Sequence, residues 1–198
     1  MSFDSLSSKF FRLFVVLEGS NPPVWRRIVV NGGTPLISIH CALQTCFGWS
    51  NEHLYMFYDE ILDYAPFEFD IPDAEDSNSL AIYNILNQIG ETIYYEYDFG
   101  NKWVHKITLE AFVDLENFNT IPFCISGERC GPPENCGGIE DYQNILKIIA
   151  DKKHKDYRET RAKIGRGWNP DRINFNKINR LLKKDEFGCK WDKFDSMS

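Results

Sequence analysis

The sequence lacks several features that would assign it to a broad class at once. Its longest apolar runs fall far short of the ~20 residues that a transmembrane helix needs. The Ser-rich segment 1–9 has no basic stretch followed by an apolar one, so we expect neither a membrane partner nor a secretory signal. The chain also contains no Gly-rich phosphate loop, no HExxH, no G-x-S-x-G and no dinucleotide-binding fingerprint. These absences exclude the enzyme classes that those motifs mark.

Composition indicates one folded domain with an uneven distribution of charge. The chain has 198 residues, of which 43% are hydrophobic and 15% aromatic, which suits a single core and does not suit a disordered chain. We expect a flexible N-terminus (1–9), a single domain (10–184) and a tail (185–198). The net charge is −7, but residues 1–146 carry 21 acidic and 7 basic side chains, whereas residues 147–198 carry 8 acidic and 15 basic ones. The net charge therefore does not exclude an anionic partner.

Alternation of apolar and polar residues predicts five strands, over 11–17, 24–30, 54–58, 92–99 and 103–113. A helix is expected over 35–47, where Thr34 suits the N-cap, Pro35 the first helical position and Gly48 the C-terminal cap. Helical spacing also marks 79–88, 139–149 and 175–182, and 121–138 is expected to be irregular. This order predicts an α+β fold in which an antiparallel or mixed sheet packs on a helix, β-grasp or roll-like, with added C-terminal helices.

Six cysteines without a secretory signal indicate free thiols in a cytoplasmic protein rather than a disulfide framework. Cys124, Cys130 and Cys136 are spaced C-x5-C-x5-C and form the only cysteine group that needs an explanation. Because thiolates and imidazoles are the usual ligands of tetrahedral zinc, these cysteines are a candidate zinc site. His105 is the predicted fourth ligand, and His53 is the other candidate. The alternative is a rigid loop, shaped by Pro and Gly, whose cysteines are packed thiols.

Two basic regions are candidates for ligand binding. Trp25, Arg26 and Arg27 combine a stacking surface with guanidinium groups that can clamp phosphates, although the same residues can simply fix the start of a strand. The segment 152–184 interleaves Lys and Arg with aromatic residues, which is typical both of nucleic-acid binding and of amphipathic helices with solvated faces. We expect a protein partner, or weak and salt-sensitive nucleic-acid binding, through these C-terminal helices.

The histidines divide into two groups. His40 and His105 lie on apolar faces, where a hydrogen-bonded core histidine is the more common outcome. His53 follows a predicted helix end and is expected near the surface, and with Asp98 and Trp103 it completes the set of candidate binding residues. If His53, His105 and Asp98 converged on one cleft, they would support an enzymatic role in which one of them acts as a general base.

Five motifs, in order along the chain, resemble one protein family. The matching residues are Pro22–Arg27; Leu36–Trp49; Asn51–Leu54 with Phe57; Tyr95–Gly100 with Trp103 and His105; and Cys124, Cys130–Gly138, Tyr142 and Leu146. Over roughly residues 10–182 the chain is similar to the plasmid pRiA4b ORF-3-like proteins, which are encoded on plasmids, insertion elements and chromosomes. Asn101 and Asn135 stand where the family pattern usually has Asp, so no carboxylate role is expected at either position.

The resemblance implies a fold and a single domain but no particular activity. A resolvase-like role gains no support, because the chain shows no constellation of a nucleophilic Ser with Arg. We therefore predict a non-enzymatic binding or interaction module with a Cys-based zinc site. The alternatives are a nucleic-acid-associated accessory protein of a plasmid or insertion element, and a metal-dependent hydrolase-like enzyme that uses His53, His105 and Asp98.

Overall fold

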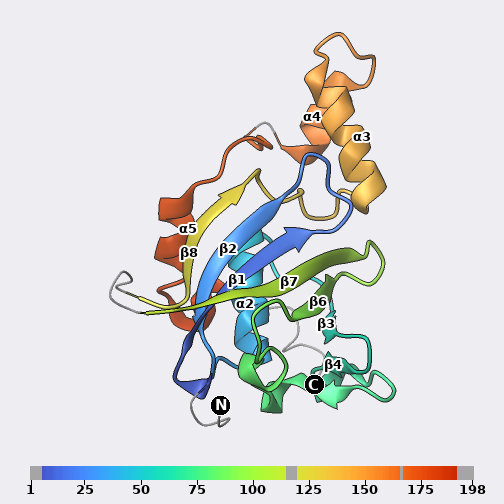
Figure 1. Cartoon of the computed structure of the whole chain (residues 1–198). Helices are drawn as coiled ribbons and strands as arrows, with labels where there is room; N and C mark the ends of the chain where they lie inside the picture. The colour runs from blue at the N-terminus through green and yellow to red at the C-terminus, as the bar shows by residue number, and fades with distance from the viewer. Residues whose placement is uncertain (1–5, 115–119, 166, 191–198) are drawn as a thin grey trace.

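The strands form one mixed sheet. The computed structural model describes residues 6–114, 120–165 and 167–190, and in it eight strands follow the order β5-β4-β3-β6-β7-β1-β2-β8 (Figure 1). Their bounds are β1 Phe10–Leu17, β2 Trp25–Asn31, β3 Tyr55–Tyr58, β4 Asp63–Ala65, β5 Glu75–Asp76, β6 Thr92–Tyr97, β7 Trp103–Val113 and β8 Phe123–Glu128. Neighbouring strands are antiparallel, except that β4 and β5 run parallel. The α+β prediction is confirmed, whereas this strand order does not confirm a β-grasp or roll.

One face of the sheet is packed and the other is half-exposed. Along β1, Phe11, Leu13 and Val15 are fully buried, and the residues between them are only half-buried. The buried face joins the same core as α2 (Leu36–Phe47), which lies behind the sheet in Figure 1. When other elements cover only one face of a sheet, buried and exposed side chains alternate along each strand, which gives a period of two residues. The five predicted strands correspond for this reason to β1, β2, β3, β6 and β7.

The helix α2 ends where predicted but begins one residue later, at Leu36, and does not have the predicted N-cap. Its N-cap is Pro35, without a side-chain cap, and the first helical N–H, that of Leu36, donates instead to the carbonyl of Leu80 at 2.9 Å. The Thr34 prediction is therefore wrong, because a neighbouring segment already satisfies this end of the helix. At the other end Gly48 adopts φ 84°, a left-handed conformation that glycine adopts without a steric penalty.

Two other segments differ from prediction. The expected helix at 79–88 consists of short 3₁₀ turns at Ser77–Ser79 and Ile82–Asn84. Its backbone is hydrogen-bonded to the chain before α2, as shown by the bond from Ile82 N–H to the Thr34 carbonyl, so tertiary partners replace the helical ones. The segment expected to be irregular contains β8, which pairs with β2 at the edge of the sheet.

The C-terminal part adds three helices. Helices α3 (Ile139–Ala150) and α4 (Tyr157–Ile164) project as a pair from one end of the sheet, and α5 (Phe175–Leu181) lies beside β8 (Figure 1). The described part of the predicted tail packs against α2, where the Thr45 hydroxyl donates to the Phe187 carbonyl at 2.7 Å. Most of the predicted flexible N-terminus (1–5) and the end of the tail (191–198) lie outside the described residues. Within the described ranges no helix is long and apolar enough to cross a bilayer.

Candidate functional site

Three separate motifs meet in a polar cluster of His53, Tyr97, Asp98, Glu134 and Asn135, which we call the His53 cluster. His53 precedes β3, whereas Tyr97 and Asp98 end β6 and begin the turn to β7. Because β3 and β6 are neighbours in the sheet, these residues lie side by side. Glu134 and Asn135 come from the loop between β8 and α3. The structure thus brings the predicted pair His53 and Asp98 together.

Tyr97 and Glu134 form the buried half of this cluster. The Tyr97 hydroxyl donates to a carboxylate oxygen of Glu134 at 2.5 Å and accepts the backbone N–H of Glu52 at 2.9 Å. The other Glu134 oxygen accepts the backbone N–H of Ser50 at 2.6 Å. Burial, with the hydrogen bond to Glu134 as the next cause, raises the pKa of Tyr97 well above its usual value. Tyr97 is therefore a neutral hydrogen-bond donor at physiological pH.

His53 and Asp98 form the more open half. The Nε2 atom of His53 lies 2.8 Å from Oδ1 of Asn135 and 3.5 Å from Oδ2 of Asp98. The same Asp98 oxygen accepts the side-chain amide of Asn101 at 2.6 Å. The His53 side chain is 31% exposed, while that of Asp98 is only 7% exposed. Nε2 thus faces two oxygen acceptors, which favours a proton on this nitrogen.

The cluster is suited to holding loops together rather than to catalysis. Its hydrogen bonds join the chain before β3, the turn after β6 and the loop before α3. Tyr97, Asp98 and Glu134 each already have a partner, and none of the five residues is a Ser, Thr or Cys nucleophile. The two Asn residues at the positions where the family usually has Asp, Asn101 and Asn135, act here as amide partners of Asp98 and His53.

His105 and His40 are core residues and do not join the His53 cluster. His105 is fully buried, its Nδ1 atom lies 3.0 Å from the Trp103 carbonyl, and its ring contacts those of Phe47 and Trp49 edge-on. Burial lowers the pKa of both histidines to about 3. A general-base set of His53, His105 and Asp98 is therefore not assembled.

The predicted zinc ligands are also not gathered. Within residues 6–114, 120–165 and 167–190, no group of three or more His, Cys, Asp or Glu side chains is arranged to hold a metal ion. Cys124 lies in β8 and contacts Cys46 of α2, while Cys136 borders a different cavity, next to α3. His105 sits in the aromatic core described above. Cys130 is half-buried and lines a cavity with Arg26, while Cys124 and Cys136 are buried, so packed thiols stay the alternative prediction for these residues.

The Trp25, Arg26 and Arg27 motif is divided between the two faces of the sheet. On the half-exposed face, Arg27 forms an ion pair with Glu110 at 2.8 Å and its guanidinium lies 5.1 Å from the Trp25 ring. On the packed face, Arg26 is 1% exposed. Alternation along a strand separates neighbouring side chains in this way, so the three residues do not form one clamp. The predicted binding residue Trp103 is likewise a core residue.

Arg26 lines a cavity of about 220 Å³ between the end of α2 and α5, which we call the Arg26 pocket. Its cationic lining residues are Arg26, Arg172 and Lys177, and none of its lining residues carries a carboxylate. The rest of the wall is largely apolar and includes Phe47, Ile173, Ile178 and Leu181. Arg26 and Cys130 belonged to the predicted site residues. Their meeting with Lys177 of α5 was not predicted, because the register of α5 against α2 cannot be read from the sequence.

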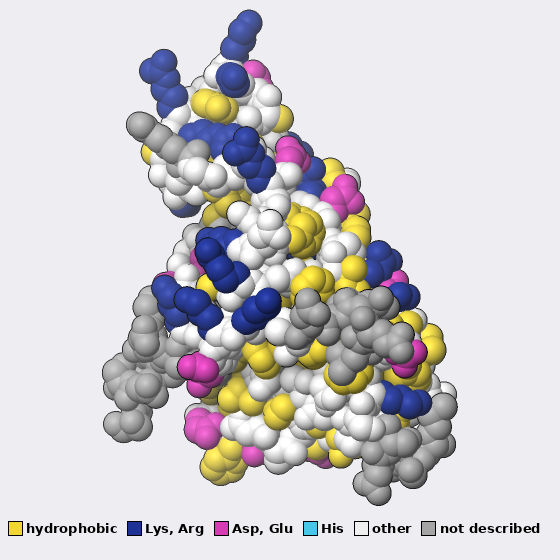
Figure 2. Space-filling view, turned by 90° about the vertical axis from the view of Figure 1, so that its left-hand side faces the viewer, with side chains coloured by type: hydrophobic (Ala, Val, Ile, Leu, Met, Phe, Trp, Pro, Cys, Tyr) yellow, Lys and Arg dark blue, Asp and Glu magenta, His cyan; other side chains and the backbone are white. Residues whose placement is uncertain are grey.

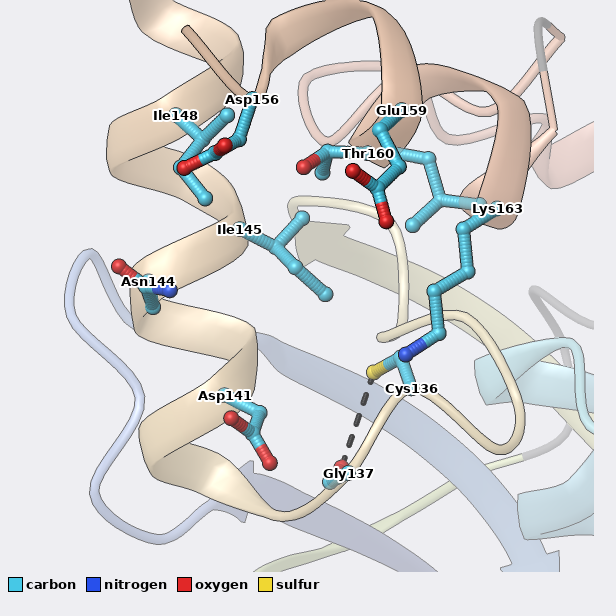
Figure 3. Close-up of a pocket in the computed structure, with 11 residues that line it drawn as sticks. Cys136, Gly137, Asp141, Asn144, Ile145, Ile148, Asp156, Glu159, Thr160 and Lys163 are labelled. Atoms are coloured by element: carbon cyan, nitrogen blue, oxygen red, sulfur yellow. Dashed lines mark hydrogen bonds between the residues drawn. The ribbon is translucent and has the colours of Figure 1, made fainter. Parts of the chain in front are cut away.

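A second cavity, of about 420 Å³, lies between α3 and α4. Figure 3 shows Glu159 of α4 pointing into the space between α4 and Ile145 of α3, and Lys163 of α4 reaching down toward Cys136. Near its lower end the Cys136 thiol donates to the Gly137 carbonyl at 3.7 Å. Sequence reasoning missed this cavity because it did not resolve α4 as a separate helix.

Comparison with known proteins agrees with the motif order. The family model of the plasmid pRiA4b ORF-3-like proteins matches residues 9–177. The chain belongs to this family. The uncharacterized protein y4hQ of Sinorhizobium fredii (strain NBRC 101917 / NGR234) is 30% identical over 188 residues, which are 91% of this chain and 93% of y4hQ.

A solved structure supports the fold of this plasmid pRiA4b ORF-3-like protein. The crystal structure of MM3350, a protein of unknown function from Methanosarcina mazei Go1, superposes with a TM-score of 0.76. It is 23% identical in sequence and covers 85% of this chain and 96% of its own chain. The likeness shows a shared fold.

Proposed function

We propose that this plasmid pRiA4b ORF-3-like protein is a non-enzymatic binding module for single-stranded nucleic acid. Its binding surface would be the α4–α5 face, which we define as α4, residues 167–174 and α5. The observation that carries the proposal is a groove of about 520 Å³ on this face, lined by Tyr157, Arg161, Gly167, Trp168, Asn169 and Arg172. Two aromatic rings and two guanidinium groups line it without a carboxylate, and these are the groups that stack on bases and contact phosphates.

The aromatic residues of the groove are held in place by the fold. The Trp168 indole donates to the Gly131 carbonyl at 3.0 Å, and Arg161 donates to the Trp168 carbonyl at 3.0 Å. The guanidinium of Arg161 also lies 5.8 Å from the Tyr157 ring. Such a fixed platform loses little entropy when a base stacks on it. Arg172 is exposed and forms no ion pair among the described residues, so its charge is available to a phosphate.

The charge around the groove supports an anionic partner. Figure 2 views the molecule from the side of α5, and Lys and Arg side chains gather there over the projecting helices and on the face below them. The excess of 15 basic over 8 acidic residues in 147–198 is the source of this positive surface. A positive groove raises the local concentration of a polyanion even when the net charge of the protein is negative.

Fluorescence anisotropy with a labelled single-stranded oligonucleotide of about 12 residues tests the proposal. We expect binding at low salt that weakens steeply between about 50 and 200 mM salt. Arg172→Gln should lower the slope of log K against log salt by about one. Lys102→Gln removes the same charge from the exposed turn between β6 and β7 and should leave that slope unchanged. Absence of binding at the lowest salt, or equal effects of the two variants, would refute the proposal.

A further inference from the structure

We infer that the Arg26 pocket binds a small organic carboxylate whose short apolar chain or ring lies against α5. The inference begins with the partners of Arg26, which is 1% exposed. Its Nε donates to the Cys46 carbonyl at 2.9 Å, and its Nη1 donates to the carbonyls of Trp25 and Glu128 at 2.7 and 3.1 Å. The remaining nitrogen, Nη2, takes part in none of these bonds. All three acceptors are neutral carbonyls.

This buried guanidinium therefore has no carboxylate partner in the described part of the chain. The ion pairs among the described residues include those of Arg12, Arg27 and Arg129 but not one of Arg26. Buried charges in proteins are normally paired, because an uncompensated charge in the interior is costly. The other arginine of the motif, Arg27, is half-exposed and nevertheless pairs with Glu110. Arg26 is buried without such a carboxylate partner, and it lines a cavity.

The cavity itself lacks a counter-charge. Arg172 and Lys177 add two further cations to its lining, and its remaining side chains are apolar or uncharged. An anion that enters the pocket would thus meet three cations and no carboxylate. A carboxylate head matches the planar guanidinium, which presents N–H groups in a fork.

The apolar wall and the volume define the rest of the ligand. Phe47, Ile173, Ile178 and Leu181 line the pocket, and the guanidinium of Arg26 stacks 4.9 Å from the Phe47 ring. An apolar cavity of about 150 Å³ holds a benzene molecule. The Arg26 pocket, at about 220 Å³, consequently has room for a ring or a chain of about six carbons together with a carboxylate. Hexanoate is a suitable probe.

The experiment is an NMR titration of the ¹⁵N-labelled full chain with hexanoate, 1-hexanol and inorganic phosphate. We expect saturable shifts from hexanoate at residues 45–48 and 172–181, with 1-hexanol and phosphate each binding at least tenfold more weakly. Lys177→Gln should weaken the binding of hexanoate about threefold. Lys183→Gln removes an exposed charge that lies after α5 and outside the pocket, and it should leave the binding of hexanoate unchanged. Arg26→Gln should reduce hexanoate affinity at least tenfold while the remaining spectrum stays dispersed.

Several results would overturn the inference. They are the absence of saturable shifts at those residues, equal binding of hexanoate and 1-hexanol, or equal binding of hexanoate and phosphate. The hydrogen bond with Cys46, together with the nearby charge of Arg26, lowers the pKa of the Cys124 thiol. A thiolate absorbance at pH 7 that disappears in Cys124→Ser would therefore show that the protein itself supplies the counter-charge. If Arg26→Gln does not fold, the comparison of the three probes on the parent protein decides. The inference does not depend on nucleic-acid binding, because hexanoate is titrated without an oligonucleotide.

Discussion

Lowering the pH from 6.5 to 5.0 is expected to destabilise this protein by about 3 kcal/mol through His40 and His105 alone. Burial lowers the pKa of each ring to about 3 in the folded protein, whereas a histidine in an unfolded chain titrates near 6.5. Below that value the unfolded state binds a proton at each ring that the folded state does not bind. The free energy of unfolding is therefore highest above pH 6.5. For each histidine it falls by about 0.7 kcal/mol per pH unit at pH 6.5 and by about 1.4 kcal/mol per pH unit from about pH 5.5 down to about pH 3.

The hydrogen bonds explain why these rings stay neutral. Nδ1 of His105 lies 3.0 Å from the Trp103 carbonyl, and its Nε2 has no hydrogen-bond partner among the described residues. Protonation would place a buried N–H there without an acceptor. In His40, Nε2 faces Oδ1 of Asn51 at 2.9 Å and Nδ1 faces the Tyr95 hydroxyl at 2.8 Å. Because Nε2–H donates to Asn51, Nδ1 must accept from Tyr95, and protonation would remove that acceptor.

Urea unfolding followed by circular dichroism at pH values from 7.0 to 5.0 measures this effect. His40→Gln and His105→Phe each remove one titrating ring, so each variant should show about half the parent's dependence of unfolding free energy on pH. His154→Gln is the matched control, because the side chain of His154 is 37% exposed. Glu110 contributes little in this range, because its hydrogen bonds and ion pair with Arg27 hold the pKa of its carboxyl below the usual value. The same pH dependence in the parent and both core variants would refute the reasoning.

Three further predictions concern packing and metal. Tyr97→Phe removes the hydrogen bond to the Glu134 carboxylate and should cost about 1.5–3 kcal/mol of stability in urea unfolding at pH 7, and an unchanged midpoint would contradict it. Gly131→Ala would place a methyl group against the Phe47 carbonyl oxygen and should lower the melting temperature. In the control variant, Gly167→Ala, the added methyl group meets open space and should leave the melting temperature unchanged. Equal melting temperatures of the two variants would contradict the prediction and show that the backbone adapts. Chelator treatment should leave the unfolding midpoint unchanged, because the described cysteines do not gather, and a lower midpoint would restore the zinc hypothesis.

Much of the local structure could be predicted because it depends on short-range chemistry. Alternation in β1 and β7 follows directly from one face of a sheet being covered. Gly48 ends α2 because only glycine adopts its left-handed backbone without a steric penalty. The prediction failed at 79–88, where hydrogen bonds to the chain before α2 compete with helical ones. It also failed at β8, whose pairing partner, β2, lies about 100 residues away in the chain.

The candidate sites were less predictable, because each depends on residues that are distant in sequence. The sequence identified His53 and Asp98 as candidates but could not show that Tyr97 and Glu134 would occupy the space beside them. It grouped three cysteines by spacing, but the fold places Cys124 in β8 beside Cys46, Cys130 in the lining of the Arg26 pocket and Cys136 at the cavity next to α3.

The sequence by itself determined the family, the positions of most strands, the end of α2 and the separation of acidic from basic residues. Only the tertiary structure decided that Arg26 turns inward without a carboxylate partner and that Arg172 and Lys177 line the same cavity. The period of the apolar residues indicates on which face of a strand or helix a side chain lies, because that face depends only on near neighbours in the chain. What meets that face depends on strand order and helix packing, which no local pattern encodes.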